Sequence, residues 1–147
     1  MFTLETEVRL ASSIDEVWPF FANAGNLERL TPSFLKFEVL TPAPIEMAVG
    51  TCIDYRLRVR GVPIRWRSEI TAWEPQRRFV DEQRRGPYRC WIHEHTFEVD
   101  GDHTVARDFV RYDHVGGRVA NRFMVGPDVR RIFAYRKKAL QEIFGAG

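Results

Sequence analysis

Cysteine and long apolar runs are scarce in this chain of 147 residues. The two cysteines, Cys52 and Cys90, form no C-x-x-C motif and are too few for a disulfide scaffold, so we expect free thiols in a reducing compartment. No stretch approaches the roughly 18 apolar residues of a membrane helix, and the first residues lack the pattern of a signal peptide. These absences predict a cytoplasmic protein without stable membrane insertion.

A strong excess of charge is also missing, because 22 basic residues are balanced by 20 acidic ones. The resulting net charge of +2 predicts no nucleic-acid partner. The chain has no phosphate loop, dinucleotide fingerprint or Ser-His-Asp signature, so we expect no cofactor. One locally basic segment lies near the C-terminus, and we expect a solvated helix face there, formed by Arg130, Arg131, Arg136, Lys137 and Lys138.

Apolar residues make up 44% of the chain and aromatic residues 13%, which predicts a folded domain whose rings can line a cavity. We expect one domain over residues 1–147. Alternating residues predict a strand over Phe2–Leu10, and Ser13 with Glu16 resembles the capping box of a following helix. A second short helix should run from about Ala24 to Leu30 and end before Thr31-Pro32.

Strands dominate the middle of the chain, and the last segment is helical. About six strands follow residue 34, and the turn signal Asp100-Gly101 predicts a hairpin between the last two. Apolar residues at three-four spacing predict a long helix over Val129–Phe144, with Gly126-Pro127 splitting it from a preceding helical turn. This order predicts an α+β fold with an antiparallel sheet.

Several stretches resemble the START-like superfamily, also called the Bet v 1-like or polyketide cyclase/lipid-transport (SRPBCC) superfamily, and within it a bacterial ligand-binding branch. The stretches are residues 13–18, 30–32, 50–55, 79–83, 86–88, 91–95 and 133–136. The resemblance implies a helix-grip fold. In it, a curved antiparallel sheet of six to seven strands wraps around a long C-terminal helix, with two short helices after the first strand. It implies no shared set of catalytic residues.

The faces of the predicted strands bring a polar group together. A turn at Asp100-Gly101 sets His95 opposite Ala106 and His93 opposite Asp108, with all of these side chains on the apolar face that should meet the helix. The preceding strand would add Asp81 beside His93. The complete candidate ligand-binding set is Tyr55, Trp66, Asp81, Gln83, Trp91, His93, His95, Asp108, Tyr112 and Phe133.

Buried carboxylates and imidazoles must pair, because leaving them unpaired costs free energy. Four interpretations follow: a structural network, a set that orients a ligand, a metal site, or a His-Asp pair for general base catalysis. We expect no metal. We also expect the pKa of His93 and His95 to be raised by Asp81 and Asp108 more than burial lowers it, which would leave at least one imidazole charged near neutral pH.

The leading functional hypothesis is a protein that carries, sequesters or senses a small hydrophobic or aromatic ligand in a pocket between sheet and helix. A charged imidazole would favour a ligand that is acidic or bears a carbonyl. The first alternative is an enzyme of the cyclase, dehydratase or hydrolase type that uses a His-Asp pair in the same pocket. The second is a protein or peptide interaction domain. A homodimer is compatible with all three.

Overall fold

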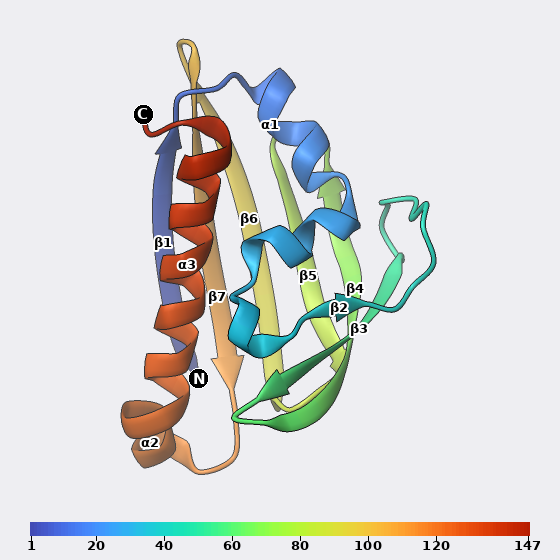
Figure 1. Cartoon of the computed structure of the whole chain (residues 1–147), viewed down its shortest axis with the longest axis vertical. Coiled ribbons are helices and arrows are strands. Elements are labelled where there is room, and N and C mark those ends of the chain that lie inside the picture. The colour runs from blue at the N-terminus through green and yellow to red at the C-terminus, as the bar shows by residue number, and fades with distance from the viewer.

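A computed structural model describes all of residues 1–147 and confirms the helix-grip fold (Figure 1). Seven antiparallel strands form one sheet in the order β1-β7-β6-β5-β4-β3-β2. The strands are β1 (Phe2–Leu10), β2 (Glu38–Val39), β3 (Cys52–Val59), β4 (Val62–Glu74), β5 (Arg78–Arg85), β6 (Cys90–Asp100) and β7 (His103–Asp113). The helices are α1 (Ile14–Phe21), η1 (Ala24–Leu30), η2 (Ser33–Leu35), α2 (Gly117–Ala120), η3 (Asn121–Val125) and α3 (Gly126–Phe144).

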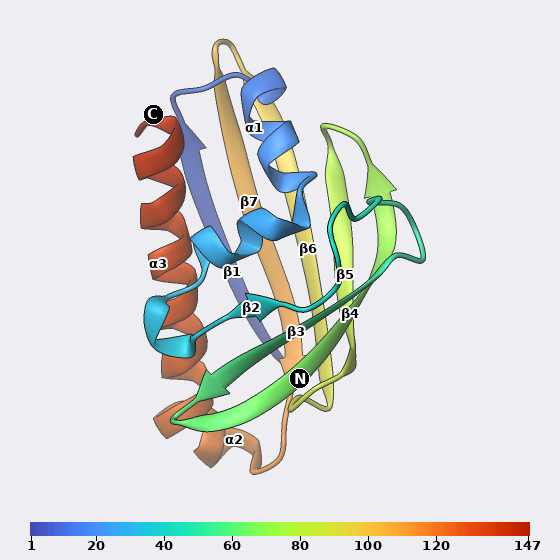
Figure 2. The ribbon, with the colours of Figure 1, turned by 45° about the vertical axis from the view of Figure 1, so that its right-hand side comes forward.

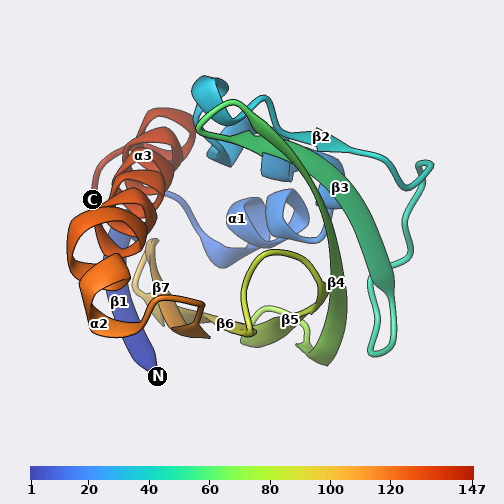
Figure 3. The same cartoon turned by 90° about the horizontal axis from the view of Figure 1, so that it is seen from below.

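The sheet curves so that its two halves lie on different sides of α3. Figures 2 and 3 show β3 and β4 bending away from β6 and β7 and returning toward the start of the helix. Two irregularities in the pairing of β4 with β5, after Arg67 and after Ile70, interrupt the ladder where the sheet bends. The β3–β4 hairpin reaches α3 through an ion pair between Arg60 and Asp128, 3.2 Å long. The curvature thus sets the width of the space between sheet and helix.

The β6–β7 hairpin forms as predicted, but its register differs. Asp100 pairs with His103, so the turn is Gly101-Asp102, and His95 lies opposite Asp108 instead of Ala106. Gly101 has a φ of 60°, which a glycine adopts without strain. Every β6 residue therefore pairs two positions further along β7 than predicted. Because side chains alternate with a period of two, the inward-facing set is unchanged.

The helices differ from the sequence expectations in local detail. Ser13 precedes α1, but its side chain makes no capping hydrogen bond, so the predicted capping box does not form. The second helix has the predicted bounds but is wound as a 3-10 helix. Gly126-Pro127 does not split the last helix, because the backbone stays helical from Gly117 to Phe144; the irregularity is a π-helical turn at Asn121–Val125, just before α3. A Cβ at Gly126 would lie 2.5 Å from the Asn121 carbonyl oxygen, so this close approach requires glycine.

Two apolar clusters pack inside the curve. The larger one contains 12 buried residues, and in it Trp18 contacts the rings of Phe79 and Phe97. The smaller one consists of Val110, Tyr112, Val129 and Phe133. Cys52 and Cys90 are both free thiols, as expected. None of the helices combines the length and the apolar character that crossing a membrane requires.

Candidate functional site

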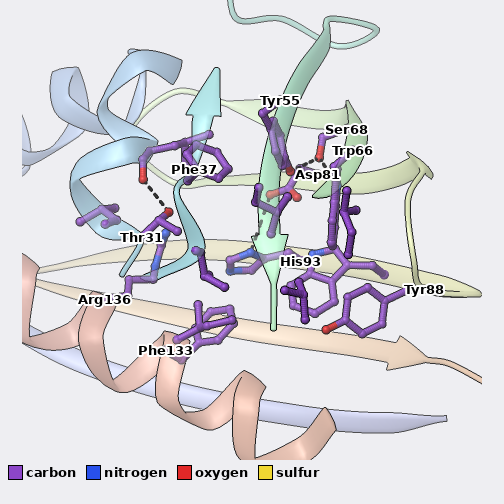
Figure 4. A pocket seen from close by; sticks show the side chains of 18 of the residues that line it. Thr31, Phe37, Tyr55, Trp66, Ser68, Asp81, Tyr88, His93, Phe133 and Arg136 are labelled. Atoms are coloured by element: carbon purple, nitrogen blue, oxygen red, sulfur yellow. Dashed lines mark hydrogen bonds and ion pairs between the residues drawn. The ribbon is translucent and has the colours of Figure 1, made fainter. Parts of the chain in front are cut away.

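A cavity of about 630 Å³ lies between the curved sheet and α3. Of its 38 lining residues 24 are hydrophobic, so its wall suits an apolar molecule. Figure 4 shows side chains from β3, β4, β5, β6 and α3 directed into it. Seven of the ten predicted site residues line the cavity, namely Tyr55, Trp66, Asp81, Trp91, His93, His95 and Phe133.

The other three predicted residues do not line the cavity. Gln83 instead supports the β5–β6 loop, since its amide exchanges two hydrogen bonds with the backbone of Tyr88. The Tyr112 hydroxyl donates to Asn121 Oδ1 at 2.9 Å, which ties β7 to the π-helical turn. Asp108 lies behind His93, where it holds the ring. Their contribution to a ligand site is therefore indirect.

The predicted polar cluster is present on three neighbouring strands. Asp81 pairs across strands with His93, and His95 pairs with Asp108, yet the hydrogen bonds run diagonally. The His95 Nε2 lies 2.6 Å from Asp81 Oδ2, and the His93 Nε2 lies 2.7 Å from Asp108 Oδ1. The two imidazole rings stack with centroids 3.6 Å apart, and Phe79 stacks on the other face of His95. Hydrogen bonds and stacking together fix the orientation of both imidazoles.

Arg136 completes this cluster, and sequence reasoning misplaced it. Instead of lying on a solvated helix face, its side chain is buried, with Nε 3.1 Å from Asp108 Oδ2 and Nη2 3.1 Å from His95 Nδ1. A signal was available: Arg136 continues the apolar stripe of α3, four residues after Ile132 and four before Leu140. A buried cation on that stripe needs a buried anion as its partner, and the predicted cluster contained two carboxylates, Asp81 and Asp108.

The contact with Arg136 fixes the protonation of His95. A guanidinium has no acceptor, so His95 Nδ1 must accept its hydrogen, and the imidazole proton resides on Nε2, which donates to Asp81. Burial, assisted by the neighbouring His93, lowers the pKa of His95 to about 4, although Asp81 opposes this. The expectation that the acids would raise the pKa is therefore wrong for His95, because desolvation outweighs them.

Both carboxyl groups stay ionised. Burial disfavours the charge of Asp108, but Arg136 and the hydrogen bond from His93 hold its pKa well below the ordinary value. Burial likewise opposes ionisation of Asp81, and the hydrogen bond from His95 with nearby positive charge lowers its pKa overall. Two carboxylates and one guanidinium thus share one buried cluster, and of these Asp81 and Arg136 line the cavity.

One ring nitrogen in the cluster remains available to a ligand. His93 donates through Nε2 to Asp108, while its Nδ1 is 3.8 Å from Asp81 Oδ2, beyond hydrogen-bond distance. No fully buried side-chain nitrogen or oxygen in the structure lacks a partner, so this Nδ1 is reachable from the cavity. His93 therefore presents Nδ1, the ring nitrogen that is not bonded to Asp108, to whatever occupies the site.

Hydroxyl groups lie on the neighbouring wall. The Tyr55 hydroxyl is 2.7 Å from Ser68 Oγ, and Trp66 donates its indole hydrogen to the same oxygen at 3.0 Å. Burial, with the negative charge of Asp81, raises the pKa of Tyr55 far above its ordinary value, so the phenol stays neutral. Sequence reasoning did not include Ser68, although its place between Trp66 and Ile70 on one strand face could have indicated it.

The cluster has some features of a metal site, but its hydrogen bonds oppose one. Ligand atoms of Asp81, His93 and His95 lie within 4.8 Å of one another. Coordination by His95 Nε2 would remove the proton from that nitrogen while Nδ1 still accepts from Arg136. The ring would have to become an imidazolate beside a guanidinium, so the donor set does not fit a divalent ion.

Comparisons with known proteins agree with this architecture. Residues 1–142 match the family described as polyketide cyclase/dehydrase and lipid transport. No curated protein matches the sequence. Three similar solved structures are protein CV1439 from Chromobacterium violaceum (14% identity, 100% of both chains, TM-score 0.77), the Zhui aromatase/cyclase from Streptomyces sp. R1128 (18% identity, 95% of this chain and 90% of that one, TM-score 0.73) and major latex-like protein 151 from Panax ginseng (10% identity, 97% of both, TM-score 0.71).

At these identities the solved structures demonstrate a shared fold alone. The family match, by contrast, spans all but the last five residues. It agrees with the helix-grip fold, and the fold encloses a cavity of ligand size. The chain therefore belongs to the polyketide cyclase/dehydrase and lipid transport family, as a ligand-binding domain of the START-like superfamily.

Proposed function

We propose that the protein binds one small hydrophobic or aromatic molecule in this cavity and carries, sequesters or senses it in the cytoplasm. The cavity itself is the observation that supports this function, because about 630 Å³ of mostly apolar space borders the buried polar cluster. Natural small-molecule sites have this composition, in which apolar walls supply affinity and a few polar groups supply orientation. The aromatic wall includes Trp66 and Trp91, whose ring centroids are 5.4 Å apart.

The polar cluster favours a ligand with a carbonyl group. Arg136 lines the cavity, and its two hydrogen bonds leave three of its five N–H hydrogens without a protein acceptor. The sequence analysis expected a charged His93 or His95 to attract the ligand, and in this proposal Arg136 is the cation that does so. A carbonyl oxygen can accept from Arg136, whereas a full carboxylate would also be repelled by Asp81.

Binding can be measured with fluorescent probes of matched shape. We expect 1-acetylpyrene to bind about tenfold more tightly than 1-ethylpyrene, because its carbonyl adds one charge-assisted hydrogen bond. Pyrene-1-carboxylate should bind more weakly than the ketone. The substitution Leu57→Trp narrows the cavity and should abolish binding of all three, while Val99→Trp on the exposed β6–β7 hairpin should not. Unchanged binding to Leu57→Trp would contradict a site in this cavity.

One observation favours an enzyme as the second candidate. Asp108 orients His93 through Nε2 and leaves Nδ1 directed to the cavity, which is the arrangement of a general base with its supporting carboxylate. A cyclase or dehydratase step would need such a base beside a polarised carbonyl. The molecule that copurifies with the protein can be identified by mass spectrometry and tested for conversion. Conversion by the intact protein and its loss in His93→Gln, with binding retained, would establish catalysis; release of the molecule unchanged would establish a carrier.

A further inference from the structure

The surface around one end of the cavity differs in character from the rest of the molecule. The cavity reaches the end formed by the β3–β4 turn, the β5–β6 loop and α2 with η3, which lie together at the bottom of Figures 1 and 2. We call this region the open end. Its lining includes Gly61, Pro87, Val115 and Met124, one or more from each of these segments.

Large apolar side chains are exposed at the open end. Along the chain, Val115, Val119 and Phe123 follow one another at intervals of four, and they are 70%, 71% and 73% exposed. Met124 beside them and Val62 at the tip of the β3–β4 hairpin are exposed as well. Half of the ten exposed large hydrophobic residues of the chain thus lie on one small region, and such clustering marks an interaction surface.

The same region is basic, because its arginines outnumber its acids. Arg118 and Arg122 alternate with the apolar residues, and Arg85 and Arg89 flank the β5–β6 loop; all four are exposed and none is in an ion pair. Two acids lie nearby. Asp128 pairs with Arg60, whereas Asp113 accepts from the His114 backbone N–H and is in no ion pair, so the four arginines outnumber it. The local charge is therefore positive although the whole chain carries only +2.

The opposite end is acidic, so charge is polarised along the long axis. Figure 1 places the start of α1, the β4–β5 turn and the β6–β7 hairpin at the top of the molecule. These segments carry Asp15, Glu16, Glu74, Asp100 and Asp102. Glu74 pairs with Arg77 and Arg78 and Asp100 pairs with Arg9, which leaves Asp15, Glu16 and Asp102 outside any ion pair. Near a negatively charged surface such a distribution turns the open end toward that surface.

We propose that the open end docks reversibly on an anionic lipid bilayer, with Val119, Phe123 and Met124 entering the interface. The exposed aromatic and aliphatic side chains suit the acyl boundary of such a bilayer, and the arginines between them suit its anionic headgroups. The segment is short and marginally apolar, so binding is peripheral. Docking sets the mouth of the cavity against lipid, and it is independent of what the cavity holds.

The test is sedimentation of the full chain with vesicles of phosphatidylcholine alone or mixed with phosphatidylglycerol. We expect binding only to the anionic vesicles, weakening as salt rises. Reversing two charges in Arg118→Glu/Arg122→Glu should lower the partition coefficient at least tenfold, since each arginine near an anionic surface contributes about a fivefold factor. Phe123→Asp should lower it by a similar factor. The matched control is Arg77→Glu, at an exposed arginine of the opposite end, and it should bind like the parent.

Several outcomes would overturn the proposal. They are equal binding to neutral vesicles, no binding to anionic ones, an equal loss in Arg77→Glu, or unchanged binding of Phe123→Asp. A protein partner at the open end would give the second of these results. The substituted side chains are exposed, so circular dichroism of each variant should match that of the parent protein, and a loss of binding then reports on the surface itself.

Discussion

Replacing Arg136 with methionine tests the buried network directly. The substitution keeps the aliphatic part of the side chain and removes the guanidinium that neutralises Asp108 and bonds His95. Breaking a buried ion pair by removing one partner costs about 3–5 kcal/mol, because the other charge stays buried and unpaired. Both side chains are nine-tenths buried or more, so solvent screening does not reduce this figure. For a chain of this size each kcal/mol lowers Tm by about 2–4 °C, so we expect a fall of about 6–20 °C.

The measurement is urea unfolding followed by circular dichroism, together with calorimetry for Tm. The control is Lys137→Met on the neighbouring, exposed position of α3, which should change the free energy of unfolding by less than about 0.5 kcal/mol. Adding Asp108→Asn to Arg136→Met should cost less than the sum of the single changes, since the asparagine leaves no buried charge behind. A loss below about 1 kcal/mol in Arg136→Met would refute the account of the pair as buried and mutually required.

Three further predictions concern the same region. The pKa of His95 is about 4 in the folded chain and near 6.5 in the unfolded one, so the unfolded chain binds the proton first as pH falls. The free energy of unfolding should therefore drop by about 2–3 kcal/mol between pH 7 and 4.5. The substitution His95→Gln should flatten this profile, and the control His103→Gln should not. A profile equally steep in His95→Gln would show that another group is responsible. Phe133→Ala should cost about 2–3 kcal/mol in urea unfolding, less than a fully enclosed ring, because one side of Phe133 already borders the cavity; a loss under about 1 kcal/mol would contradict its packing with Val110. Elemental analysis of the purified protein should find zinc well below one equivalent, and a full equivalent that is lost in His95→Ala would instead establish a metal site.

The polar cluster was predictable because a register shift of two residues leaves every side chain on the same face of its strand. The hairpin register was wrong by two residues, yet His93, His95 and Asp108 kept the same face, since a shift by two preserves the alternation of side chains. Asp81 was placed correctly opposite His93 because the alternation of β5 also held. The local sequence of each strand determines which side chains point inward, and the fold then brings the inward faces of β5, β6 and β7 together.

Arg136 and Gln83 were not predictable in this way, because their roles depend on partners distant in the fold or on loop shape. A basic run on a helix is usually solvated, and only the three-dimensional position of Asp108 and His95 makes burial of Arg136 favourable. Gln83 points to the loop because the β5–β6 pairing stops at Glu82, which alternation cannot reveal. The tautomer of His95 followed only once the position of Arg136 was known.

The buried pair between Arg136 and Asp108 also decides which wall of the cavity can move. Swinging α3 outward would separate this pair, at a cost of about 3–5 kcal/mol. Lifting the β3–β4 hairpin breaks the exposed ion pair between Arg60 and Asp128, which is worth about 0–1 kcal/mol. A difference of about 3 kcal/mol corresponds to more than a hundredfold in population. We therefore expect α3 to stay in place while the β3–β4 hairpin moves. Substitutions at Arg60 should alter the rate at which a ligand enters and leaves the cavity, and they should leave the polar cluster intact.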